Sequence, residues 1–246
     1  MSWLAVLLVG VAVADLGHSV RPVRHLPEAV GAVAAVALGL LAGLTGWPDL
    51  LALAVVAAVV VMWGRTVRVG FGRGRAWLPL TLLGTAVLVA LLCAPLADDA
   101  AGAVGRWLDA TGSERLAGVD PDHALLVLAV VLLQCSTGNV LVRLVLAATG
   151  TVNPSRGPAH DATRTLKGGR LLGPMERLVI LGLGLAGQVT AASLVIAAKG
   201  LIRWPELRSI EPGEGHPTIN EVTEYFLVGS FVSWLVPLAS LVLVAA

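Results

Sequence analysis

The chain of 246 residues is too apolar for an ordinary soluble domain, because 57% of its residues are hydrophobic and only 13% are charged, against ~25% charged in typical soluble domains. Its net charge of +1 gives no reason to expect a nucleic-acid partner. The apolar residues fall in blocks long enough to cross a bilayer, which takes roughly 20 residues of helix. This pattern predicts a polytopic helical membrane protein.

Seven candidate spans follow one another along the chain. They cover residues 2–20, 28–46, 49–64, 76–96, 123–147, 174–204 and 219–245. The first has no basic residue before its apolar run, so we interpret it as a retained helix and not as a cleaved signal peptide. Cys93 and Cys135 lie inside apolar runs and indicate no disulfide. The predicted fold is an all-α transmembrane bundle of about seven helices, a single integral membrane domain over residues 1–246.

The distribution of Lys and Arg predicts the orientation. With seven spans, twelve of the seventeen basic residues fall on one side, which is then cytoplasmic, so the N-terminus lies outside and the C-terminus inside. Residues 150–173 form a basic cytoplasmic loop. Residues 97–122 form an acidic extracytoplasmic loop with an interfacial helix anchored by Trp107. The predicted location is a bacterial cytoplasmic (inner) membrane.

The segment "GPMER" predicts a helix start. Gly173 caps it, Pro174 is its first residue, and Glu176 meets the positive end of the helix dipole. Arg170 and Arg177 fit an interface where their heads reach lipid phosphates. A second interpretation makes Glu176, Arg177 and Arg170 a site for a lipid or another phosphate-bearing substrate.

Two charged pairings are expected at the ends of the last three spans. At the inner end, Arg143 or Arg177 is expected to meet Glu176, an arrangement we name the inner clasp. At the outer end, cationic residues that close one span face acidic residues that open the next. This outer clasp comprises Lys199, Arg203, Glu221, Glu224 and Tyr225. Charges so close to hydrocarbon are costly unless they are paired.

Polar side chains within the fifth and sixth spans have two interpretations. Gln134 and Gln188 are expected near the middle of the bilayer on adjoining helices, and Asn139 and Arg143 share a helix face. They act either as interhelical hydrogen-bonding groups that hold the bundle together or as the lining of a polar conduit.

An ionisable pair occurs late in the first span. Asp15 follows twelve apolar residues, and His18 lies one turn later. The pair is a candidate proton or cation site. The alternative is that the helix ends early and that both side chains lie at the cytoplasmic interface.

The segments "GGRLLGPMER", "AAKGLIRWPEL" and "EYFLVGSFVS", together with Gln188, resemble the C-terminal half of an uncharacterised family of bacterial integral membrane proteins. The resemblance covers residues 168–235, with Gly200 and Ser230 standing where that family tends to serine and threonine. The N-terminal half lacks the Asp-Phe-x-x-Gln segment of that family. The matching positions are Gly169, Gly173, Glu176, Arg177, Lys199, Arg203, Glu224, Tyr225 and Gly229. The resemblance implies one membrane module and no particular activity.

Three functions remain open. The first is a non-enzymatic scaffold or partner-binding component, whose basic loop at 150–173 docks anionic lipid or a cytoplasmic protein and which could form a homo-oligomer. The second is a small transporter or channel with a polar path between the first, fifth and sixth spans. The third is a membrane enzyme that acts on a lipid or phosphate-bearing substrate. No motif indicates a cofactor, and the histidines show no metal-ligand spacing.

Overall fold

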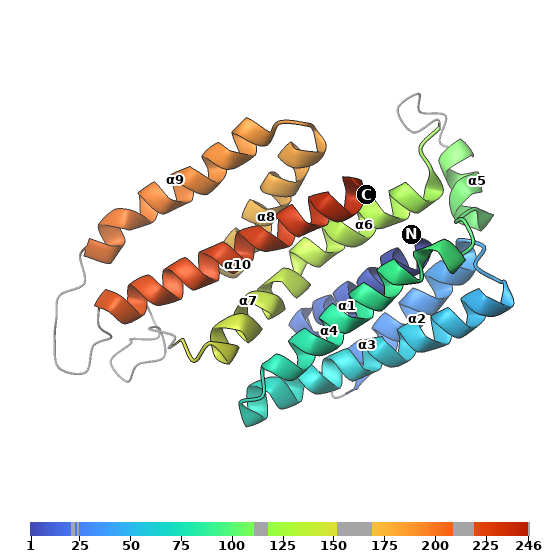
Figure 1. Cartoon of the computed structure of the whole chain (residues 1–246), viewed down its shortest axis with the longest axis horizontal. Coiled ribbons are helices and arrows are strands. Elements are labelled where there is room, and N and C mark those ends of the chain that lie inside the picture. Colours follow the sequence, from blue (N-terminus) through green and yellow to red (C-terminus); the bar gives the residue numbers. More distant parts are fainter. Residues whose placement is uncertain (21–22, 24, 111–117, 152–168, 209–218, 246) are drawn as a thin grey trace. The chain divides into compact units, whose positions relative to one another are not determined.

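The computed structural model describes residues 1–20, 23, 25–110, 118–151, 169–208 and 219–245 (Figure 1). Over these ranges the protein is all-helical, with ten α-helices, one short 3-10 helix and no strand. The elements are α1 (Ser2–Val20), α2 (Leu26–Leu41), α3 (Trp47–Arg73), α4 (Trp77–Leu92), η1 (Ala94–Leu96), α5 (Gly102–Ala110), α6 (Pro121–Cys135), α7 (Thr137–Ala148), α8 (Gly169–Leu185), α9 (Val189–Arg208) and α10 (Ile219–Ala245).

Three helices in this part of the chain are long and apolar enough to cross a membrane. They are α1, α3 and the Thr223–Ala245 part of α10. A fourth candidate is α6 together with α7, counted as one broken span. Helices α2 and α4 are apolar but shorter. The all-α prediction is therefore confirmed, whereas the number of spans and their orientation stay predictions.

Two helices that the sequence predicts as continuous are broken. Ser136, with φ −132° and ψ −57°, separates α6 from α7. The predicted span 174–204 is divided into α8 and α9 by a turn at Gly187, which has φ 73°. There the Gln188 N–H donates to the Leu183 carbonyl and the Gly187 N–H to the Gly184 carbonyl, the pattern of a Schellman helix end. A residue with a side chain rarely adopts this left-handed conformation, so the glycine fixes the turn.

The chain divides into two compact units, Met1–Thr137 and Gly138–Ala246. The first unit is built around α1, which packs on α2, α3 and α6. Helices α1 and α2 approach closely where Gly31 meets Gly10. A Cβ added to Gly31 would lie only 2.5 Å from the Gly10 carbonyl oxygen. Small residues at such crossings allow backbones to meet. Most of α1 is consequently buried in protein, including Leu4, Val6 and Val11.

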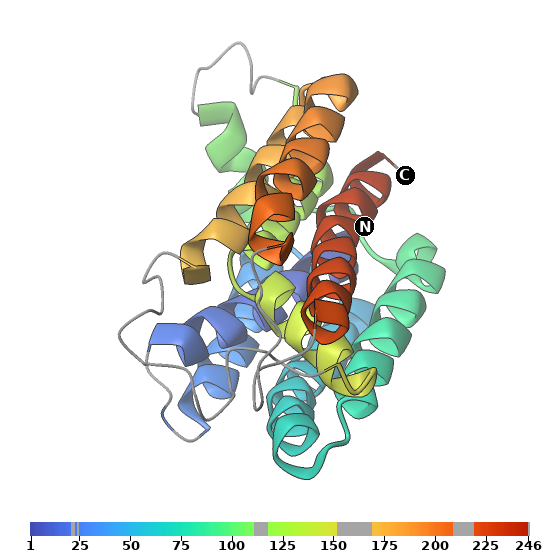
Figure 2. The ribbon, with the colours of Figure 1, turned by 90° about the vertical axis from the view of Figure 1, so that its left-hand side faces the viewer.

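The second unit contains a helical hairpin, α8–α9, packed against α10 (Figure 2). Helix α8 contacts both α9 and α10. Gly184 makes room for Leu241, since a Cβ on that glycine would overlap the leucine side chain. This hairpin brings residues of α8 and α9 that are far apart in sequence to the same level, and it forms the frame of the candidate site.

Candidate functional site

Arg177, in the middle of α8, is almost fully buried, with 1% of its surface exposed. Its Nη2 donates to Asn139 Oδ1 at 2.8 Å, and its Nη1 donates to Ser233 Oγ at 3.2 Å. These two partners belong to α7 and α10, so one guanidinium joins three helices. Its fixed fork of donors suits such a role better than a single ammonium group does.

A glycine makes space for this guanidinium. A Cβ on Gly138 would lie 2.6 Å from Arg177 Nε and 2.8 Å from its Cζ. The start of α7 therefore lies directly against the charged group. Arg177 is held by hydrogen bonds on two sides and by close packing on a third.

An ion pair joins the two arms of the hairpin. Lys199 Nζ on α9 donates to Glu176 Oε2 on α8, and both side chains are largely buried, at 18% and 16% exposure. Glu176 lies eleven residues before Gly187 and Lys199 twelve residues after it. Because the turn reverses the chain at that glycine, these nearly equal separations along the two arms place the two residues opposite each other.

The hydrogen bond to Ser233 fixes how far along α10 these charges lie. Ser233 is at the centre of the apolar stretch Thr223–Ala245. From Arg177 to Gly184 is seven residues of α8, and from Ser233 to Leu241 is eight residues of α10, so the two helices run parallel in register. The turn at Gly187 is then level with the C-terminal end of α10, and Glu176, Arg177 and Lys199 are level with its middle.

The structure pairs Lys199 across the two predicted clasps, with Glu176 of the inner one. Glu176 does pair with a cation, but the cation is Lys199 of the neighbouring arm, and Arg177 bonds to polar uncharged partners. Lys199 was predicted to pair with Glu221 or Glu224 at the opposite end of a continuous helix. The turn at Gly187 folds it back beside Glu176. Glu224 is exposed and Tyr225 half-buried on α10, while the side chains of Arg170, Arg203 and Glu221 lie outside the described residues.

The glutamines are not at matching positions in their helices. Gln188 is exposed in the turn between α8 and α9, and not in the middle of a helix. Gln134 is fully buried near the end of α6, where its Nε2 donates to the Val130 carbonyl at 2.9 Å. Because Gln134 and Gln188 belong to different units, the contact between them stays a prediction, as does the polar conduit. Arg143 is exposed on α7.

Asp15 and His18 lie in different surroundings, so their role as a proton or cation site stays a prediction. Asp15 is buried and accepts a hydrogen bond from Trp63 Nε1 at 3.0 Å, whereas His18 is exposed. The partner that the sequence did not indicate is therefore an indole on α3. No group of three or more His, Cys, Asp or Glu residues suited to a metal ion occurs among the residues that the structure describes.

Two carboxyl groups lie close together near the N-terminal end of α1. Asp49 accepts a hydrogen bond from Trp3 Nε1 at 2.6 Å. Asp98 lies beside Asp49, and its backbone N–H points to Asp49 Oδ1 at 3.5 Å. The hydrogen bond between the two side chains, together with the negative charge of Asp49, raises the pKa of Asp98 above its ordinary value.

This raised pKa predicts a stability that depends on pH. The folded chain holds the Asp98 proton to a higher pH than the unfolded chain, so the contribution is complete below the unfolded pKa and is lost as pH rises through the folded pKa. Asp98→Asn mimics the protonated side chain and should flatten this fall. The measurement is the melting temperature in detergent across the acidic range. An equally steep profile for the variant would contradict the prediction.

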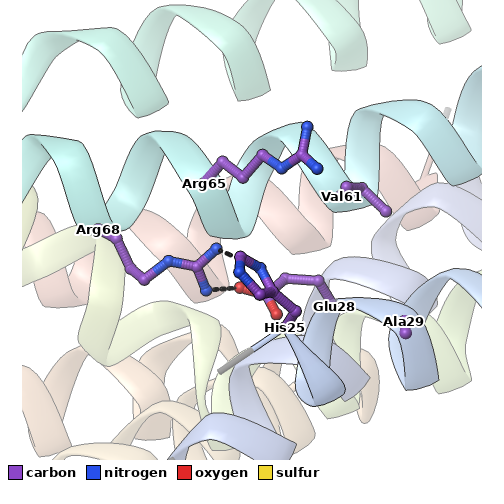
Figure 3. Close-up of a pocket in the computed structure, with 6 residues that line it drawn as sticks. All are labelled: His25, Glu28, Ala29, Val61, Arg65 and Arg68. Atoms are coloured by element: carbon purple, nitrogen blue, oxygen red, sulfur yellow. Dashed lines mark hydrogen bonds and ion pairs between the residues drawn. The ribbon is translucent and has the colours of Figure 1, made fainter. Parts of the chain in front are cut away.

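A pocket of about 220 Å³ opens between the N-terminal end of α2 and α3 in the first unit. It is lined by His25, Glu28, Ala29, Val61, Arg65 and Arg68 (Figure 3). Arg68 forms an ion pair with the buried Glu28 and also contacts His25 Nδ1 at 3.4 Å. Glu28 and Arg68 are forty residues apart in the chain, so no local sequence pattern indicates their pairing.

No known protein family, no curated protein and no solved structure matches this chain. The resemblance to an uncharacterised bacterial family therefore stays a prediction.

Proposed function

We propose that the chain is a multi-pass protein of a bacterial cytoplasmic membrane that works without catalysis, as a scaffold or partner-binding component. The observation that supports this proposal is the mutual pairing of the buried charges in the second unit. Glu176 is matched by Lys199, and Arg177 is held by Asn139 and Ser233. Residues that compensate one another in this way stabilise the fold without a bound substrate.

The depth of these charges strengthens the argument. If the apolar stretch of α10 crosses the bilayer, residues level with Ser233 lie near its middle, about 16–18 Å along a helix from the turn at Gly187. A charge at that depth is costly unless it is paired. We infer that the Glu176–Lys199 pair is a structural connection between α8 and α9. Like the predicted clasps, it holds two helices together by a charge pair, but the two partners differ from those predicted.

The hairpin also supports a revised topology. When α8 and α9 are separate crossings and α6–α7 is one, the chain crosses eight times and both termini lie outside. Thirteen of the seventeen Lys and Arg residues then face the cytoplasm, two lie within the membrane, and only Arg106 and Arg115 lie outside. This split is sharper than the twelve to five of a seven-span arrangement, as the positive-inside rule favours.

The topology predicts which positions react with a membrane-impermeant maleimide in intact cells. In a variant without Cys93 and Cys135, the single changes Gln188→Cys and Ala245→Cys should be labelled from outside, because both positions lie at the outer face. Arg73→Cys is the matched cytoplasmic control and should react only after lysis. Labelling of Ala245→Cys only after lysis would support seven spans and contradict the eight-span topology.

The scaffold role is tested by purifying the tagged chain in mild detergent, with mass spectrometry of the proteins and lipids that accompany it. We expect a stoichiometric protein partner or a homo-oligomer. A chain that purifies as a monomer without any protein partner would contradict the scaffold proposal.

A further inference from the structure

The pocket of the first unit holds two groups with unused binding capacity. Arg65 lines the pocket from α3 and makes no hydrogen bond or ion pair with the residues that the structure describes. Glu28 is 4% exposed, and only its Oε1 is bonded, by Arg68. Its Oε2 is buried and has no hydrogen-bond partner within the described chain. The pocket therefore offers a cationic donor and a carboxylate acceptor to one ligand.

The position of Glu28 results from a specific arrangement of neighbouring residues. A Cβ on Gly64 would overlap the Glu28 side chain, so only glycine at this point of α3 lets the carboxylate lie between the helices. A buried carboxylate oxygen without a hydrogen-bond partner destabilises the folded chain. A ligand that donates a hydrogen bond to Oε2 would remove this cost, which is why the unbonded atom indicates a ligand and not merely an ion pair.

The charge of the pocket indicates the charge of the group that it binds. Glu28 and Arg68 neutralise each other, so Arg65 leaves one positive charge that favours a monoanion. The N-terminal end of α2 adds to this preference, because the N–H groups of Leu26 and Glu28 have no intrahelical partner, although Pro27 has no N–H, and the helix dipole is positive there. His25, the residue before α2, forms no side-chain cap that would occupy those groups.

The location of the pocket points to the membrane interface. The apolar run from Leu50 to Gly64 is 15 residues, about 22 Å of helix, and it ends directly before Arg65. A cationic side chain at the end of such a run lies at the level of lipid headgroups. The volume of about 220 Å³ is smaller than the ~300–1,000 Å³ of pockets for drug-sized molecules, and it suits a small polar headgroup.

We propose that this pocket binds the headgroup of a phospholipid that combines a phosphodiester with a hydrogen-bond donor. The phosphodiester meets Arg65 and the first turn of α2, and an ammonium or hydroxyl group of the headgroup donates to Glu28 Oε2. Phosphatidylethanolamine and phosphatidylglycerol both carry such a donor, whereas phosphatidylcholine has the same phosphodiester and none. The proposal rests on the membrane placement proposed above.

The test is native mass spectrometry of the full-length protein in detergent, titrated with the dioleoyl forms of these three lipids. We expect phosphatidylethanolamine or phosphatidylglycerol to bind about tenfold more tightly than phosphatidylcholine, a difference of about 1.4 kcal/mol. Arg65→Gln should weaken the binding of all three lipids, because the phosphodiester that Arg65 contacts is common to them. Ala29→Leu, which fills the pocket from an exposed position, should do the same.

Arg73→Gln is the matched control, because Arg73 is exposed on the same helix but does not line the pocket. It should bind lipid like the wild type. Equal binding of phosphatidylcholine, or equal losses in Arg65→Gln and Arg73→Gln, would overturn the proposal. Displacement of the lipid by an equal concentration of soluble glycerophosphoethanolamine would overturn the lipid as the source of the headgroup.

The headgroup proposal and the proposed membrane placement can fail separately. A chain released from membranes by alkaline carbonate would contradict the membrane proposal. A chain that stays in the membrane and binds the three lipids equally would contradict only the headgroup site.

Discussion

Exchanging the charges of Glu176 and Lys199 should restore most of the stability that either single reversal removes. Glu176→Lys places two ammonium groups together, and Lys199→Glu places two carboxylates together, where the wild type has an ion pair. Leaving a largely buried charge without its partner costs on the order of 3 kcal/mol. The double variant recreates the pair in the opposite sense. Thermal unfolding of the four proteins in detergent gives the coupling energy.

Glu224→Lys is the control for this cycle. Glu224 is exposed on α10, and it is one of the two acidic residues that the sequence predicted to meet Lys199 or Arg203. Its reversal should change the melting temperature little and should show no coupling to Lys199→Glu. If instead Glu224 couples to Lys199 and Glu176 does not, the hairpin arrangement of α8 and α9 is incorrect.

Replacing Arg177 should cause the largest loss of stability of any single change in the second unit. Arg177→Met removes the guanidinium from a buried position and leaves Asn139 Oδ1 and Ser233 Oγ without their donor. The lost hydrogen bonds of a charged group and the unsatisfied partners together should cost about 3–5 kcal/mol. The free energy of unfolding in detergent, compared with that of the exposed-site variant Arg73→Met, measures this loss.

Arg177→Lys separates the role of geometry from the role of charge. One ammonium group keeps the charge but cannot reproduce two diverging N–H bonds of a planar fork. We therefore expect this variant to be nearly as unstable as Arg177→Met. Full stability of Arg177→Lys would show that the charge alone matters and would contradict the hydrogen-bonded role of the guanidinium.

The helices could largely be predicted from sequence, because the lengths of the apolar runs and the polar, glycine and proline residues between them indicate where helices begin and end. The span predicted at 2–20 is α1, the span at 219–245 is α10, and the interfacial helix predicted near Trp107 is α5. The turn at Gly187 was missed because its only signals are a few glycines and one glutamine within an apolar run. Glycine is tolerated inside transmembrane helices, so composition alone does not distinguish a continuous helix from a hairpin there.

The residues of the candidate site could be predicted from the sequence, but the contacts between them could not. Glu176, Arg177, Lys199 and Asn139 were all recognised as charged or polar groups in apolar surroundings. Their partners depend on which helices adjoin, and one missed turn moved Lys199 from the far end of a helix to a place beside Glu176. Ser233 and Glu28 were not singled out, since a serine in an apolar helix and a glutamate in a first turn are common for local reasons.

The central place of α1 has a consequence for synthesis. This helix leaves the ribosome before α6, one of the helices that cover it, which begins about a hundred residues later. At ~5–20 residues per second, α1 waits roughly 5–20 s for that neighbour. Until α3 arrives, Asp15 also lacks the Trp63 indole. If α1 enters the membrane as proposed, we expect an insertase or the translocon to shelter it during this interval, and chains that stall before α6 to expose it to quality-control proteases.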